Sequence, residues 1–233
     1  MAPCHPGCLD ARLTVMTAAS ALRGLLVENP GSAGERKRAQ RWQWLHKTFP
    51  DLDRLSVIDL GGTADSWQRA PVRPAEVHVV NLEPEASDLP TWIRTDQGDA
   101  CNLPDRILAR HYDLVFSNAV LEHVGGHTQR IRFADSVHAL ADRHWVQTPY
   151  RYFPIEPHWL FPGFQFLPLN VRAGVAQRWP LAHSVASTRE DGLQGALSVE
   201  LIGRTEMAYC FPTSSIRVER MFGLVKSLIA VRA

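Results

Sequence analysis

Three histidines and one glutamate stand in sequence contexts that suit proton transfer. His123 lies in "LEHVGGH", and His127 follows the two glycines of the same stretch. Glu156 and His158 flank a single proline, so in an extended chain their side chains point the same way. An imidazole, with an unperturbed pKa of about 6.5, can take a proton from a hydroxyl, and a carboxylate can orient it. The sequence therefore predicts general-base catalysis, with His123 as the first candidate and helix packing as its structural alternative.

Two further interpretations of Glu156 and His158 stay open. Carboxylate and imidazole groups both bind divalent metals, so the pair can hold an ion such as Mg²⁺. The pair can also belong to a proline-rich surface turn in which the carboxylate meets the nearby Arg151. The sequence does not decide among base, metal ligands and turn.

A glycine pair follows an apolar run in "VIDLGGTADSWQ", residues 57–68. Glycines here let the backbone approach a ligand, and the N-terminus of the following helix favours anions. The third glycine of the dinucleotide fingerprint is missing and Pro71 shortens the helix, which favours a ligand without a pyrophosphate. About 20 residues after Gly61, where a group that binds ribose hydroxyls is expected, stand Asn81 and then Glu83. A turn is the alternative role for both.

Strand-like and helical runs alternate along the chain and would position these residues. Residues 35–49 and 128–142 predict helices, and strands are predicted at 55–60, 76–82, 92–95, 112–117 and 144–148. This alternation indicates a parallel sheet with helices on both faces. Residues 215–222 and 224–233, separated by Gly223, predict an antiparallel hairpin at one edge.

Residues 149 to about 205 fit neither pattern. Prolines exclude a long helix through the first part of the segment, which is also rich in aromatic residues. A connection of this length predicts a cap over the carboxyl ends of the strands, where open α/β sheets bind ligands. Tyr150, Arg151 and Trp159 are its candidate substrate contacts, and the cap's own core is the alternative for the aromatic rings. We expect a tail or helix over 1–34 and one domain over 35–233.

Composition excludes some partners. A formal net charge of +1 and a pI near 7.8 give no field to attract nucleic acid or an anionic membrane, and no stretch reaches the ~20 apolar residues of a membrane span. Four scattered cysteines indicate neither a disulfide framework nor a zinc site, and no signal peptide is evident. We therefore expect a cytoplasmic protein that acts on a small molecule or oligosaccharide, and a homo-oligomer stays open.

Two more motifs complete a pattern. With "DQGDACNLP" (96–104) and "YDLVFSNAVLEHV" (112–124), the chain resembles the class I S-adenosylmethionine-dependent methyltransferases, in particular the type 11-like subgroup. The resemblance runs from Ser56 to Val124 and resumes at "ERMFGLVKSLIAV", whose hairpin matches the antiparallel seventh strand of that family. It implies a Rossmann-like α/β sheet with a C-terminal antiparallel hairpin and a cap insertion between the fifth and sixth strands.

The resemblance also implies a cofactor, S-adenosylmethionine, and residues that hold it. Near the methionine part of the cofactor would lie Asp59, Gly61, Gly62, Ser117 and Asn118. Asn81 or Glu83 would bind the ribose, and Asp99 and Ala100 would contact the adenine edge. Trp67 would close over the cofactor. Asn81 departs from the acidic residue usual in the family.

Transfer to an alcohol needs a base, so we expect O-methylation with His123 in that role. "LEHV" combined with "TPYRYFPIEPHW" resembles methyltransferases of bacterial saccharide and glycolipid pathways, and is similar to the 1-O-methyltransferases of methylmannose polysaccharide synthesis. A phenol or quinone methyltransferase, whose acceptor is more acidic, is one alternative. A catalytically silent cofactor-binding module is another, and a nicotinamide dehydrogenase is disfavoured by the missing glycine.

Overall fold

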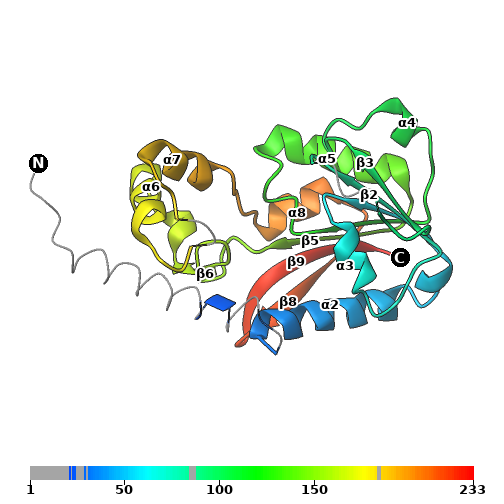
Figure 1. Ribbon diagram of the computed structural model, residues 1–233, viewed down its shortest axis with the longest axis horizontal. Coiled ribbons are helices and arrows are strands. Elements are labelled where there is room, and N and C mark those ends of the chain that lie inside the picture. Colours follow the sequence, from blue (N-terminus) through cyan, green and yellow to red (C-terminus); the bar gives the residue numbers. More distant parts are fainter. Residues whose placement is uncertain (1–20, 22, 25–28, 30, 84–87, 183–184) are drawn as a thin grey trace, which may run out of the picture. The chain divides into compact units, whose positions relative to one another are not determined.

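The computed structural model describes residues 21, 23, 24, 29, 31–83, 88–182 and 185–233 (Figure 1). They belong to two compact units. Unit 1 contains the described residues up to Gln43 together with Pro154–Leu197, and unit 2 contains Trp44–Phe153 and Ser198–Ala233. Most of the predicted N-terminal tail or helix, residues 1–34, lies outside the described residues.

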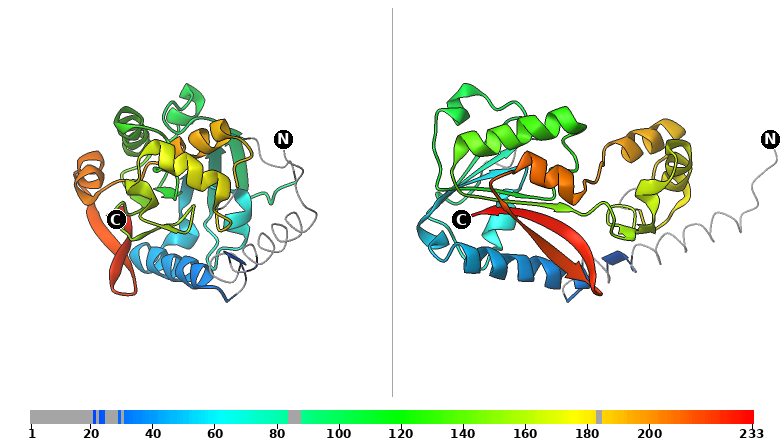
Figure 2. Two further views of the ribbon diagram at one scale, coloured as in Figure 1. Left: turned by 90° about the vertical axis from the view of Figure 1, so that its left-hand side faces the viewer. Right: turned by 180° about the vertical axis from the view of Figure 1, so that it is seen from behind.

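A seven-stranded sheet forms the centre of unit 2. Its order is β3-β2-β1-β4-β5-β9-β8, with β1 to β5 parallel and β9 antiparallel to both β5 and β8. The strands are β1 (Ser56–Leu60), β2 (Glu76–Asn81), β3 (Ile93–Gln97), β4 (Leu114–Asn118), β5 (His144–Pro149), β8 (Ser215–Met221) and β9 (Leu224–Arg232). The predicted fold class is therefore confirmed, including the terminal hairpin, whose strands β8 and β9 lie at one edge (Figure 2).

The central strands are short and buried along nearly their whole length, even where they carry polar residues, because helices cover both faces of the sheet. In Figure 1, α5 and α8 lie on one face, and α3 and the last turn of α2 lie on the other. The helices of this unit are α3 (Ala64–Gln68), α4 (Asp105–Leu108), α5 (His127–Leu140) and α8 (Arg204–Cys210), with the 3₁₀ turn η2 (Leu52–Arg54), while α2 (Ala33–Thr48) belongs partly to each unit. None of the described helices combines the length and apolar character that a membrane crossing requires.

The order of the strands determines where a ligand can bind. Neighbouring β1 and β4 connect onward to opposite sides of the sheet, through β2 and through β5. At such a point the loops after the two strands diverge, and the crevice between them is the usual ligand site of open α/β sheets. The carboxyl ends of β1, β2 and β4 therefore position the candidate site.

Unit 1 is built from short elements around a small core. They are β6 (Ile155–Glu156), β7 (Phe161–Pro162), η3 (Phe164–Phe166), α6 (Leu169–Arg178) and α7 (Arg189–Leu197). Helices α6 and α7 approach closely through small residues, since a Cβ on Gly192 would lie 2.8 Å from the Ala173 carbonyl oxygen. As predicted, no long helix runs through the proline-rich start of this segment.

Candidate functional site

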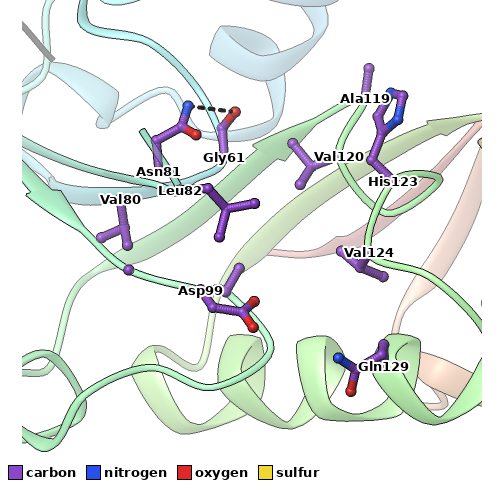
Figure 3. A pocket seen from close by; sticks show the side chains of 12 residues that line it. Gly61, Val80, Asn81, Leu82, Asp99, Ala119, Val120, His123, Val124 and Gln129 are labelled. Atoms are coloured by element: carbon purple, nitrogen blue, oxygen red, sulfur yellow. Dashed lines mark hydrogen bonds between the residues drawn. The ribbon is translucent and has the colours of Figure 1, made fainter. Parts of the chain in front are cut away.

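A cavity of about 310 Å³ opens at the carboxyl ends of β1, β2 and β4 (Figure 3). Its walls combine backbone, apolar side chains and a few polar groups, which is typical of small-molecule sites. The lining residues are Gly61, Val80, Asn81, Leu82, Gly98, Asp99, Ala100, Ala119, Val120, His123, Val124 and Gln129. In Figure 3, Asn81 and His123 lie on opposite sides, with Leu82 and Val120 between them.

Close packing explains the two glycines after β1. Gly61 has φ +82°, and a Cβ there would lie 2.6 Å from Val120 Cγ1. A Cβ on Gly62 would overlap Asp59 Oδ2. Only glycines leave room for both neighbours, so the loop brings bare backbone to the cavity.

The buried side chain of Asp59 supports this glycine loop. Its carboxylate is buried, and Oδ2 accepts a hydrogen bond of 2.7 Å from Trp67 Nε1. Trp67 is itself buried and makes an edge contact with Phe116, with ring centroids 5.1 Å apart. Both residues lie outside the set that lines the cavity, although the sequence predicted them as cofactor contacts. In the structure they join β1 to α3 and support the loop.

Asn81 links the second strand to the same loop. Its Nδ2 donates to the Gly62 carbonyl at 2.8 Å and, more weakly, to that of Gly61 at 3.5 Å. An aspartate here would have no proton to donate to these carbonyls. The amide therefore fixes the loop with its nitrogen, and its oxygen is the end that can accept from a hydroxyl.

Asp99 and Ala100, which follow β3, and Leu82, which follows β2, also line the cavity. Asp99 Oδ1 accepts from Cys101 N at 2.8 Å, which holds the loop in a tight turn. Burial raises the pKa of the neighbouring Cys101 thiol to about 11, so it stays neutral. Leu82 is 66% exposed although it is apolar, and its side chain borders the cavity. A carboxylate beside an apolar surface suits a flat heterocycle with polar edges.

The remaining predicted cofactor residues, Gly62, Ser117, Asn118 and Glu83, also lie outside the set that lines the cavity. Ser117 is fully buried, and its hydroxyl donates to the Leu60 carbonyl at 2.9 Å, tying β4 to β1. Asn118 is half-buried at the end of β4, and Glu83 is exposed just after β2. Gly61, Asn81, Asp99 and Ala100 are thus the predicted cofactor residues that the fold brings together at the cavity.

His123 lies at the cavity's edge, in the turn between β4 and α5. Its Nδ1 is 3.1 Å from the Ser198 carbonyl oxygen. A carbonyl only accepts, so Nδ1 carries a proton, and in the neutral ring Nε2 is the nitrogen with the lone pair. The adjacent Glu122 is buried, and its Oε2 accepts from Thr148 Oγ1 at 2.9 Å. In the neutral form of His123, this hydrogen bond favours the tautomer whose Nε2 can accept a proton.

The sequence matches no protein-family model and no curated protein. Solved structures do match. An S-adenosylmethionine-dependent methyltransferase from Mesorhizobium loti is 17% identical over 82% of this chain and 97% of its own, with a TM-score of 0.51. A protein of Bordetella parapertussis described as a possible exported protein is 15% identical over 92% and 79%, with a TM-score of 0.52. The magnesium protoporphyrin IX methyltransferase of Synechocystis, solved with S-adenosylmethionine bound, is 13% identical over the whole of both chains, with a TM-score of 0.47.

The chain has the class I methyltransferase fold. In this fold the cavity occupies the crevice between β1 and β4, where the strand order reverses.

His127, the second histidine of the same turn, lies outside the set that lines the cavity. It is the first residue of α5, and its Nδ1 is 3.2 Å from Glu206 Oε1 on α8. Burial raises the pKa of Glu206, but hydrogen bonds from Arg130 and His127 outweigh this and leave it below the ordinary value. His127 therefore pairs with an ionised carboxylate that joins two helices.

Glu156 and His158 form a defined pair in unit 1. Glu156 is buried; its Oε2 accepts from the backbone N–H groups of His158 and Trp159, both at 2.8 Å, and its Oε1 accepts from His158 Nδ1 at 2.6 Å. The carboxylate thus organises the turn and fixes the Nδ1–H tautomer of the imidazole. The structure thus brings the two side chains into contact, and these contacts agree both with an oriented base and with a structural turn.

The predicted substrate residues differ in their surroundings. Trp159 is buried and stacks on Phe164 with centroids 4.7 Å apart, so its ring belongs to the core of unit 1. Tyr150 is half-buried after β5 and packs against the core of unit 2. Arg151 is exposed, and its backbone N–H donates to the Ile202 carbonyl at 3.0 Å.

Several lining residues were missed by sequence reasoning. Leu82 had a signal, because an apolar residue stands between the two polar candidates Asn81 and Glu83. Gln129 had none, since only the packing of α5 brings it to the cavity. The others contribute backbone or aliphatic surface at the strand ends: Val80, Gly98, Ala119, Val120 and Val124.

Proposed function

We propose that this protein is an S-adenosylmethionine-dependent O-methyltransferase that acts on a hydroxyl of a saccharide or glycolipid-type acceptor. One observation carries the proposal. The cavity at the strand ends combines a glycine loop, an amide that can hydrogen-bond a ribose hydroxyl, and an imidazole oriented by a hydrogen bond at Nδ1. The class I methyltransferase fold supports the same conclusion, as does the order of the sequence motifs.

The lining fits a nucleoside joined to an amino acid. The Asn81 side-chain oxygen would accept from a ribose hydroxyl, and Leu82 with Ala100 would flank the adenine, whose amino edge suits the Asp99 carboxylate. The Gly61 backbone would face the methionine part. When bound, S-adenosylmethionine supplies a methyl group on a sulfonium, from which the thioether departs neutral.

Proton removal from the acceptor is the step that the chain's own residues must assist. An alcohol is barely acidic at neutral pH, and a positioned base contributes about 10²–10⁴-fold. His123 Nε2 carries a lone pair at the cavity's edge and takes that role. His127 and the Glu156–His158 pair are the alternative bases, and a divalent metal bound by Glu156 and His158 is a further alternative. The metal is disfavoured because both oxygens of Glu156 already accept hydrogen bonds.

The acceptor class rests on the likeness of "LEHV" and "TPYRYFPIEPHW" to saccharide and glycolipid methyltransferases. We further propose that residues 149–205 act as the substrate cap of a domain spanning 35–233, and that Tyr150, Arg151 and Trp159 belong to its acceptor site. A phenol or quinone acceptor is the alternative, because it needs little help from a base. A cytoplasmic location agrees with the buried free thiols of Cys101 and Cys210.

Calorimetric titration tests the cofactor. S-adenosylhomocysteine should bind with one-to-one stoichiometry, and NAD should give no heat of binding. Binding of NAD alone would overturn the proposal. A Gly61→Val variant, whose side chain would collide with Val120, should abolish the binding of S-adenosylhomocysteine and serves as the site control.

Transfer from S-adenosylmethionine labelled in its methyl group tests the acceptor. Mannosides, methylated mannosides and glycolipids are compared with phenols and quinones, each with magnesium and with a chelator. We expect labelled saccharide ethers in both conditions. Label only in phenols or quinones would reassign the acceptor, and cofactor binding without transfer to any class would favour the silent binding module.

A further inference from the structure

We propose that Arg130 is a positioning residue that sets the tautomer and orientation of His123 through the segment Ser198–Glu200. The inference rests on the proposed function only in so far as His123 serves as the base. The structural relation itself is independent of the reaction. It connects a buried guanidinium on α5 to an irregular segment that enters α8.

Arg130 is a buried cation between two carboxylates. Its side chain is only 3% exposed, with Nη1 2.6 Å from Glu206 Oε1 and Nη2 2.7 Å from Glu200 Oε2. Nη2 also donates to the Glu200 backbone carbonyl at 3.3 Å. The planar guanidinium therefore holds both the side chain and the main chain of Glu200 in one place.

The segment held by Arg130 contacts His123 directly. The Ser198 carbonyl accepts from His123 Nδ1 at 3.1 Å, and Glu200 N donates to the carbonyl of Glu122 at 2.8 Å. Residues 198–200 connect α7 to α8 and have no regular structure of their own. The hydrogen bond from Glu200 N to the Glu122 carbonyl and the contacts of Arg130 with Glu200 contribute to the position of the Ser198 carbonyl.

This arrangement resembles the way in which a second residue orients a catalytic base. The partner of Nδ1 decides which imidazole nitrogen has the lone pair. Here that partner is a main-chain carbonyl whose position depends on a side chain about 70 residues earlier in the sequence. Loss of the guanidinium should loosen the Glu200 end of this segment and shift the Ser198 carbonyl, and His123 should then sample the second tautomer and other orientations more often.

The ¹⁵N resonances of the His123 ring test this inference without any assay of activity. In the full-length wild-type protein we expect a protonated Nδ1 and an unprotonated Nε2, assigned by comparison with His123→Gln. In Arg130→Met both resonances should move toward the values of a tautomer mixture in which Nε2–H predominates. Unchanged resonances in Arg130→Met would overturn the proposal.

Matched variants separate positioning from folding. Glu200→Gln changes an exposed side chain and should move the same resonances less, so it keeps the test valid if Arg130→Met does not fold. Arg143→Met, which breaks the ion pair between Arg143 and Asp51, should leave His123 unchanged. Unchanged His123 resonances in Glu200→Gln, when Arg130→Met fails to fold, would also overturn the proposal.

Kinetics connect the inference to the proposed function. Arg130→Met should lower kcat by roughly 10- to 100-fold, as expected for a misplaced catalytic group, with KM for S-adenosylmethionine nearly unchanged. Arg130→Lys should recover part of the loss. If the wild type transfers no methyl group, the proposed function fails, and the ring resonances still decide the role of Arg130.

Discussion

His123 in unit 2 and His158 in unit 1 are held by the same ring nitrogen but by different partners. His123 Nδ1 donates to the Ser198 backbone carbonyl at 3.1 Å, and His158 Nδ1 donates to the buried Glu156 carboxylate at 2.6 Å. A charged partner gives the shorter and stronger hydrogen bond. By hydrogen-bond strength alone, His158 would be the better oriented base.

The surroundings of the two histidines reverse that ranking. His123 borders the cavity formed by the ends of β1, β2 and β4. Glu156 has a second task, because it also accepts from two backbone N–H groups of its own turn. The Glu156–His158 pair thus organises a turn, whereas His123 both joins its turn to the Ser198 carbonyl and borders the cavity. Position at the cavity, more than hydrogen-bond strength, is the reason to propose His123 as the base.

The largest expected effect tests this ranking directly. His123→Gln should lower kcat by about 10²–10⁴-fold, because the proton acceptor is lost, while His158→Gln should change it less than about threefold. Steady-state methyl transfer measures both variants. The affinity for S-adenosylhomocysteine should stay near the wild-type value in each. An equal fall in kcat in the two variants would contradict the choice of His123 as the base. A larger fall in His158→Gln would favour His158 instead.

Much of unit 2 could be predicted from the sequence because its signals are local. The runs "SVIDL" and "EVHVVN" are rich in valine and isoleucine, which favours buried strands, and the glycine loop with Asn81 follows a spacing typical of nucleoside sites. Gly61 and Asn81 accordingly line the cavity. Helices α6 and α7 could not be predicted from the sequence, since they are short and are interrupted by glycines, which disfavour helix, and they pack closely against each other.

Residues whose partners are distant in the sequence could not be predicted. Asp59 looked like a cofactor ligand, and only the structure reveals that Trp67 donates to its carboxylate. The role of Arg130 could not be predicted, because its partners Glu200 and Glu206 lie 70 and 76 residues away in the sequence. A sequence reveals that a polar residue stands in an apolar setting, whereas its partner depends on tertiary packing.

Substitution of one glycine in each unit should have different effects: in unit 2 the affinity for S-adenosylhomocysteine should fall, and in unit 1 the stability should fall. Gly62→Ala should weaken the binding of S-adenosylhomocysteine by about 10- to 100-fold, since the new Cβ collides with Asp59 and overpacking costs about 1–3 kcal/mol. Gly192→Ala meets the Ala173 carbonyl and should lower stability by about 1–2 kcal/mol while leaving the affinity unchanged. Calorimetry and urea denaturation measure the two quantities. Loss of affinity in Gly192→Ala would contradict the separation.

Acid should destabilise unit 2. Among the described residues, the three histidines whose pKa is clearly lowered, His78, His138 and His144, all lie there, and burial lowers the pKa of His144 to about 4. The unfolded chain binds a proton near pH 6.5, so the contribution of neutral His144 is complete above that pH and is lost as pH falls toward 4.

The loss from His144 alone should approach about 3 kcal/mol near pH 4. Urea denaturation between pH 7.5 and 4.5 measures it, and His144→Gln should flatten the profile. A pH dependence that is the same in His144→Gln would mean that other groups, such as His78, dominate.

The smallest effect is expected from Glu156→Gln, and it gives the sharpest test of the comparison. A glutamine carbonyl can still accept from the backbone N–H groups of His158 and Trp159, so the turn should lose less than about 1 kcal/mol. The glutamine amide, however, donates toward His158 Nδ1 and reverses the tautomer, leaving Nε2 protonated and unable to act as a base. If His123 is the base, kcat should not change although His158 has lost its lone pair at Nε2. A fall in kcat of about 100-fold or more in a stably folded Glu156→Gln would instead identify His158 in unit 1 as the base. Glu156 would then orient a catalytic imidazole as well as support the turn.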